Sequence, residues 1–173
     1  YLVCDKNLVR VDRAMPYDWI DKCDSGSSAG TSFYYEGERI FTYQLCASKG
    51  AKACVAKTFE KTGTKVCFDV KYLTRNENGE NVKLSLTSDG KECVSVFDNG
   101  SKSYSKDVAA LREHHAFVWQ RIRIEADIQT QKAFVWHNGK KCTYIDFDEK
   151  TSFFDGISIS YEPENGGIMK FTD

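Results

Sequence analysis

The 173-residue sequence predicts an all-β fold, an antiparallel β-sandwich, from three observations. Short segments in which apolar and polar residues alternate recur along the chain, which is the pattern of strands buried on one face. Turn dipeptides such as Asn-Gly, Asp-Gly and Gly-Gly separate these segments roughly every 8–12 residues. Only one segment has the character of a helix, so at most one or two short helices are expected. About ten short strands then form two facing sheets in a single domain, residues 1–173.

The first third of the chain is its least regular part. Residues 1–31 are expected to pack on the sandwich, beginning with an edge strand at 8–11. Pro16 can open a short helical turn at 17–22, and the small residues of 25–31 predict a flexible loop. Alternating residues then predict strands at 32–45 (one strand or two), 55–59, 65–73, 82–86 and 93–97.

The second half of the chain contains the most regular pattern. Segment 105–115 is the helix candidate, with Ser105 as its N-cap. Segment 117–147 then predicts a three-stranded meander, in which Asn138-Gly139 is the strongest hairpin signal because both residues tolerate positive φ. Further strands are expected at 153–161 and 168–173.

The register of the first hairpin in the meander follows from its polar connection. If Ile128 pairs with Gln131, then Ile124 lies opposite Val135. Both of these side chains point to one side of the sheet, and so does Ala126 with its partner. This side is therefore expected to face the core.

The opposite side of the same hairpin is the candidate ligand site. The register places Arg123 beside Trp136 and Glu125 beside Phe134, and Arg121 lies on the same side. An exposed aromatic ring can stack on the C–H face of a sugar while charged groups take its hydroxyls. The alternative is a second layer of packing, in which a loop covers the tryptophan and Arg123 rests on its ring.

Composition excludes two classes of partner. The chain has 24 basic and 25 acidic residues, well mixed, whereas nucleic-acid binding favours a basic stripe. No apolar run approaches the ~18 residues of a membrane span, so we expect no membrane insertion. The chain shows no signal peptide and does not begin with Met, which reads as a trimmed start.

The seven cysteines favour disulfides in an oxidising compartment, because no CxxC pair or zinc-like histidine spacing is present. Cys46–Cys54 is the expected pairing, because the two residues bracket a short loop. Cys4–Cys23 and Cys67–Cys93 are further candidates that the sequence does not fix, and the odd count leaves one thiol. The sequon Asn99-Gly100-Ser101 is either a glycosylation site or a chance tripeptide. We therefore expect a secreted protein or a domain at the cell surface.

The meander resembles the "W-x-x-v-x-i-x-x-D … v-x-v-N-G-k" pattern of concanavalin A-like lectin and glucanase domains, the jelly-roll relatives of laminin G modules. The matching residues are Trp119, Ile122, Ile124, Asp127, Val135, Asn138, Gly139 and Lys140. The same strand rhythm extends over residues 64–173, whereas the first third of the chain does not match. The resemblance implies a concanavalin A-like jelly roll.

The resemblance also implies activities that can be weighed against these residues. The glucanase branch uses a strand of the form E-x-D-x-(x)-E, which Glu125 and Asp127 begin, but Gln129 or Thr130 occupies the position of the last Glu. A polysaccharide lyase would need a Tyr or His base beside an Arg or Gln such as Arg121. Neither motif is complete. Glu125 and Asp127 are therefore better explained as solvent-exposed charges along a strand than as a catalytic pair.

Related modules often place a calcium-ligating Asp near the end of the domain. Asp173 occupies that position here, and Asp146 and Asp155 are further oxygen donors. A structural calcium ion is thus one reading of these residues, and ordinary surface acids are the other.

Two hypotheses of function follow from this sequence. The first is a non-catalytic glycan-binding module whose partner is a glycan or glycoprotein. The second is an adhesion domain that binds a protein partner and has no sugar pocket, because the unmatched first third of the chain covers the groove.

Overall fold

The computed structural model describes residues 8–13, 15–16, 18–76, 79–98, 103–104 and 117–172. Over these residues the chain forms strands and no helix, so none of them belongs to a helix that could cross a membrane. The strands are β1 (Leu8–Arg13), β2 (Trp19–Asp21), β3 (Ser27–Glu36), β4 (Glu38–Ala47), β5 (Ala53–Thr62), β6 (Lys65–Thr74), β7 (Val82–Ser88), β8 (Lys91–Asp98), β9 (Ser103–Tyr104), β10 (Gln120–Asp127), β11 (Lys132–His137), β12 (Lys140–Asp146), β13 (Phe154–Tyr161) and β14 (Gly167–Thr172).

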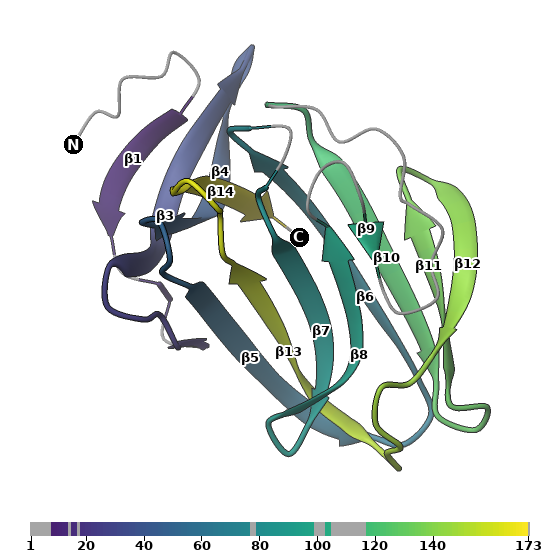
Figure 1. Cartoon of the computed structure of the whole chain (residues 1–173). Coiled ribbons are helices and arrows are strands. Elements are labelled where there is room, and N and C mark those ends of the chain that lie inside the picture. The colour runs from purple at the N-terminus through teal and green to yellow at the C-terminus, as the bar shows by residue number, and fades with distance from the viewer. Residues whose placement is uncertain are drawn as a thin grey trace.

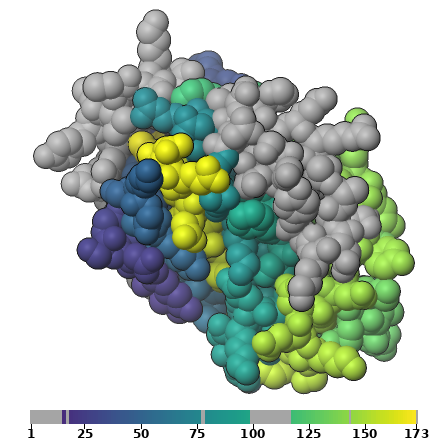
Figure 2. Space-filling model, viewed as in Figure 1, coloured from purple at the N-terminus to yellow at the C-terminus, as the bar shows by residue number. Residues whose placement is uncertain are grey.

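The strands form two antiparallel sheets that face one another (Figure 1). One sheet has the order β1-β3-β4-β14-β6-β10-β11-β12, and the other has the order β2-β5-β13-β7-β8-β9. We call them the eight-stranded and the six-stranded sheet. Figure 2, drawn from the same side, presents the outer face of the six-stranded sheet, with the teal β7–β8 region near its centre. The predicted antiparallel β-sandwich is confirmed.

The space between the sheets holds the main hydrophobic core. Every second residue of the inner strands points into it, as the period of two predicts, and Ile122, Ile124 and Val135 are each at most 1% exposed. A polar contact crosses the core, in which the Tyr72 hydroxyl on β6 donates to the Asp98 carboxylate on β8. Burial, followed by the negative charge of Asp98, raises the pKa of Tyr72 well above its ordinary value.

The predicted hairpin register is confirmed. Ile124 pairs with Val135, and Arg123 pairs with Trp136. The predicted turn follows, with φ of 48° at Asn138 and 80° at Gly139. These positive angles are the reason that this dipeptide suits a two-residue hairpin, in which the turn must match the twist of its strands.

Two predictions for the first third of the chain are wrong. The expected helical turn at 17–22 contains strand β2 instead, which pairs with β5 at the edge of the six-stranded sheet. Trp19 packs there against Tyr43 and Phe171, at ring distances of 5.3 and 5.6 Å, so tertiary packing outweighs the local helix signal. The expected loop at 25–31 is mostly strand β3, because its small residues pair with β4 from Ser27 onward. The helix candidate at 105–115 lies outside the described residues.

The predicted disulfides are also wrong where they can be traced. Free thiols occur at all six described cysteines: Cys23, Cys46, Cys54, Cys67, Cys93 and Cys142. Alternation along β4 and β5 turns Cys46 and Cys54 to the outer faces of different sheets. Cys67 lies on the outside of the eight-stranded sheet, whereas Cys93 lies in the core. Cys4, and with it the pairing to Cys23, lies outside the described residues. With the other pairings gone, the secreted location loses its support from disulfides.

Candidate functional site

Four neighbouring strands, β6, β10, β11 and β12, carry the candidate site on the outer face of the eight-stranded sheet. We call this surface the open half. Strand register places its outward side chains in three successive rows across the sheet: Lys71 and Arg121; Asp69, Arg123, Trp136 and Lys141; Cys67, Glu125, Phe134 and Tyr144. The open half is therefore built from long charged side chains and aromatic rings, while the inward residues of the same strands are apolar.

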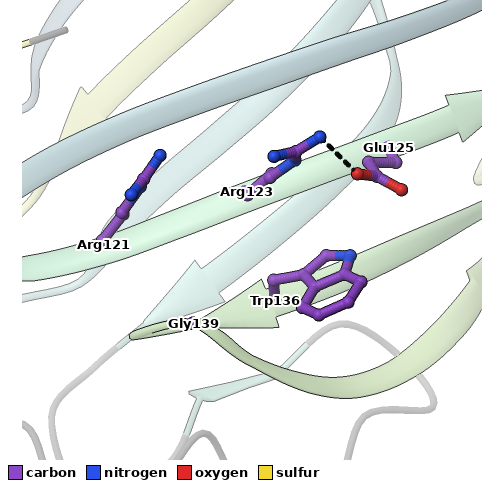
Figure 3. A pocket seen from close by; sticks show the side chains of 5 residues that line it. All are labelled: Arg121, Arg123, Glu125, Trp136 and Gly139. Carbon is purple, nitrogen blue, oxygen red and sulfur yellow. Dashed lines mark ion pairs between the residues drawn. The ribbon is translucent and has the colours of Figure 1, made fainter.

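A hollow of about 370 Å³ lies in the open half, lined by Arg121, Arg123, Glu125, Trp136 and Gly139 (Figure 3). Four of these five residues were predicted as ligand-binding from the sequence. The fifth, Gly139, belongs to the hairpin turn that closes one end of the hollow, where a residue without a side chain leaves space.

Arg121 is fixed through both its side chain and its backbone. Its guanidinium donates from Nε and Nη2 to the two carboxylate oxygens of Asp69, at 2.8 and 2.5 Å. Its backbone N–H donates to Asn138 Oδ1 at 2.8 Å, and its carbonyl accepts from the Asn138 N–H at 2.9 Å. The Arg121 hydrogen bond holds the pKa of Asp69 below its ordinary value. The same turn that sets the strand register thus positions Arg121.

Arg123 and Glu125 form an ion pair at 2.6 Å along β10, next to Trp136 (Figure 3). Asp127, the second carboxylate of the glucanase-like pattern, lies further along the strand. Its carboxylate accepts a hydrogen bond from the Gln129 N–H at 2.9 Å and forms an ion pair with Lys65 at 3.5 Å. The two carboxylates thus have separate structural partners, as expected of solvent-exposed charges along a strand.

Trp136 has a hydrogen-bonding group that the fold does not satisfy. Its indole N–H is buried and, among the described residues, it and the N–H of Trp19 are the two buried side-chain nitrogens without a partner. Such a donor costs about 1–3 kcal/mol. Trp19 is packed between Tyr43 and Phe171, whereas Trp136 lines the hollow with its indole nitrogen on the side of Arg123 and Glu125 (Figure 3).

Phe134 and Tyr144 form an exposed aromatic pair beside the hollow. They are 40% and 53% exposed, and their rings meet edge to face with centroids 6.2 Å apart. Lys141 Nζ lies 3.7 Å from the Phe134 ring centroid and 5.9 Å from that of Trp136. The cation beside the Phe134 and Trp136 rings is therefore Lys141 and not Arg123, which forms an ion pair with Glu125.

Four charged or aromatic residues of the open half were missed by the sequence analysis: Asp69, Lys71, Lys141 and Tyr144. Asp69 and Lys71 belong to β6, and pairing of β6 with β10 joins segments about fifty residues apart that no local pattern connects. Tyr144 could have been found by extending the register across the Asn138-Gly139 turn. An irregularity between Val135 and Trp136 shifts that register by one residue, however.

The centre of the same outer face over β3, β4 and β14 is buried, and we call this part the closed half. Ser32, Thr42 and Lys170 are not exposed at all. At its border Leu73 and Tyr34 form a second hydrophobic cluster with Ile40, Phe117 and Trp119. The first third of the chain supplies β1, β3 and β4 to the far edge of this sheet, so those described strands extend the sheet and do not cover the hollow.

The residues considered for calcium have other partners or cannot be placed. Asp173 lies outside the described residues. Asp146 pairs with Lys132 at 3.3 Å, and the Asp155 carboxylate accepts from the Asp89 N–H at 3.1 and 3.3 Å. Within the described part of the chain, no group of three or more His, Cys, Asp or Glu side chains is arranged to hold a metal ion.

No protein-family model and no curated protein matches this chain. Among solved structures, a sialidase superimposes on 90% of the chain with a TM-score of 0.71 and 10% identity, and an exo-β-agarase on 92% with 0.56 and 9%. The carbohydrate recognition domain of Emp47p superimposes on 94% with 0.51 and 11%. The chain spans 16% of the sialidase, 23% of the agarase and 91% of the Emp47p domain. The fold is therefore a concanavalin A-like jelly roll, as the resemblance implied.

Proposed function

We propose that this chain is a glycan-binding module that holds its ligand in the hollow of the open half. The observation that carries the proposal is the environment of Trp136. A half-buried indole ring lines a hollow next to an Arg–Asp pair and an Arg–Glu pair. A sugar ring offers an apolar C–H face to the indole and hydroxyls that can both donate and accept.

Pre-organisation of the hollow supports the same proposal. Asp69 and Asn138 hold Arg121, and Glu125 holds Arg123, before any ligand is present. Side chains already fixed in their bound geometry lose less conformational entropy on binding. The likeness to the Emp47p carbohydrate recognition domain supports the proposal as well, because a domain of similar size and fold recognises carbohydrate there.

A glycan array probed with the full chain tests the proposal. Wild type is expected to bind one group of related glycans, and Trp136→Ala to weaken that binding at least about tenfold, as loss of a central aromatic contact does. Phe59→Ala is the matched control, because Phe59 is a comparably exposed aromatic on the six-stranded sheet. An array without hits, or hits that Trp136→Ala leaves unchanged, would contradict the proposal.

The second candidate function is protein binding, and the exposed Phe134–Tyr144 pair favours it. The pair lies on β11 and on the edge strand β12, where exposed aromatic residues are typical of interface anchors. A partner captured by wild type, retained by Trp136→Ala and lost by Tyr144→Ala would select this function over glycan binding.

A further inference from the structure

A second hollow adjoins the first on the same outer face. It has a volume of about 390 Å³, and its lining includes Trp119, Lys71, Thr172 and Glu36. Arg121 lines this hollow as well as the one at Trp136, so the two are contiguous. The second hollow lies at the border between the open half and the closed half, where β6, β14 and the start of β10 meet.

Each of the two hollows contains one tryptophan. Trp119, Arg121 and Arg123 alternate along one extended segment, and Trp136 lies opposite Arg123. At ~3.4 Å per residue, Trp119 and Trp136 are separated by roughly 13 Å along the strand direction. A ligand that contacts both rings must therefore be longer than a single sugar ring.

Trp119 is held in place by packing behind it. Its ring meets Tyr34 edge to face at 5.5 Å, and it belongs to the cluster around Leu73. The backbone before it is fixed as well, because the Phe117 N–H donates to the Thr74 carbonyl at 2.9 Å. Trp119 nevertheless remains half-buried and lines the second hollow, so part of its ring is accessible to a ligand.

Most of the charges at the two hollows have an opposite charge beside them, which favours a neutral ligand. Asp69 balances Arg121, and Glu125 balances Arg123. Lys71 and Glu36 line the second hollow together. Donor N–H groups and acceptor carboxylates thus lie side by side, which suits hydroxyls because each hydroxyl both donates and accepts. An acidic sugar would place a like charge near these carboxylates.

We propose that the second hollow is a further sugar subsite, and that the ligand is a neutral oligosaccharide of at least two rings which lies across Arg121. This inference rests on the proposed glycan-binding function and deepens it. Trp119 contacts one ring, Trp136 contacts another, and Arg121 donates to oxygens between them.

The test is an array on which several neutral glycans are printed as chain-length series from one to six rings: β-1,4-glucan, β-1,3-glucan, mannan, xylan and chitin oligosaccharides. Hyaluronan oligosaccharides serve as the acidic counterpart of the chitin series. Wild type is expected to bind one neutral series about tenfold more tightly at four rings than at one. Trp119→Ala should reduce the four-ring affinity to within about threefold of the one-ring affinity, and leave the latter unchanged.

Two further variants keep the result interpretable if Trp119→Ala folds poorly. Trp119→Phe retains a ring and should retain most of the length dependence. Lys71→Ala removes an exposed side chain of the second hollow alone, and should weaken only the longer chains. Phe59→Ala again serves as the unaffected control.

The outcomes separate the two proposals. Binding that is equal at every chain length, that is unaffected by Trp119→Ala and Lys71→Ala, or that is confined to hyaluronan overturns the second subsite while glycan binding stands. Binding to no series overturns both. Length-dependent binding that Trp119→Ala abolishes, with one-ring binding intact, supports the second subsite.

Discussion

One outer face of this molecule contains two halves of opposite character. Over β3, β4 and β14 the central outward side chains of the eight-stranded sheet are buried, and Ser32, Thr42 and Lys170 among them are 0% exposed. Over β6, β10, β11 and β12 the outward side chains are exposed or partly exposed, apart from Leu73 at the border with the closed half. The two halves share one sheet and one alternating pattern. The alternation of apolar and polar residues thus determines which side chains point away from the core, but not whether those side chains are exposed to solvent.

The difference also shows how the open half can be specialised for binding. A face that is already covered contributes to stability through packing, whereas an uncovered face can change with little effect on the fold. Stability and pH dependence test this difference between the halves, and thiol accessibility separates the outer face from the core.

The largest expected effect is on stability. Leu73→Ala removes a fully buried side chain from the closed-half cluster and should lower the free energy of unfolding by about 3 kcal/mol, because it leaves a cavity. Phe134→Ala, in the open half, should change it by less than about 1 kcal/mol. Urea unfolding followed by tryptophan fluorescence measures both. Equal losses for the two variants would mean that Phe134 is packed as part of the fold.

The pH dependence of stability should show the burial of Lys170. Its ammonium donates to Ser32 Oγ at 2.5 Å and to the Phe33 carbonyl at 3.0 Å, and burial lowers its pKa to about 8. In the unfolded chain the pKa is about 10.4. Between these values the unfolded state holds a proton that the folded state has lost, so the contribution of Lys170 to stability rises with pH in this window.

Comparison with Lys170→Met isolates this contribution from other titrating groups. The difference in unfolding free energy, wild type minus variant, should increase by roughly 2 kcal/mol from pH 7.5 to pH 10. Urea unfolding at several pH values provides the measurement. A difference that stays constant with pH would show that the Lys170 amine is solvated, and the closed half would then be open.

The smallest effect involves the cysteines and changes no stability. Cys67 and Cys142 are exposed on β6 and β12 and should react with a maleimide in the native state. Cys93 is buried, and burial raises the pKa of its thiol, so it should react only after unfolding. Peptide mass mapping should find all six described cysteines labelled in denaturant without reductant. A cysteine that is labelled only after reduction would show that it forms a disulfide, contrary to this expectation.

The sequence predicted the fold and the local part of the site. Alternation and the Asn138-Gly139 turn were sufficient to place Arg123 beside Trp136, because a hairpin register depends on neighbouring residues. The small residues of 25–31 indicated a loop, but from Ser27 onward they pair with β4 as part of β3.

The remaining parts depend on contacts between distant segments. Asp69 reaches Arg121 only because β6 lies next to β10, and Trp119 lines a hollow only because β14 lies beyond β6. The disulfide prediction failed for the same reason. Cys46 and Cys54 are close in sequence, but a crossing from one sheet to the other separates their side chains.

The central claim is that the hollow at Trp136 receives the ligand, and the indole N–H groups test it most directly. The three tryptophans give three indole signals in a ¹⁵N–¹H NMR spectrum, which Trp→Phe variants assign. On titration with the tightest-binding oligosaccharide from the array, the Trp136 signal should shift in a saturable manner, while the Trp19 signal, in the interior, stays in place. A saturable titration that leaves the Trp136 signal unmoved would contradict the account.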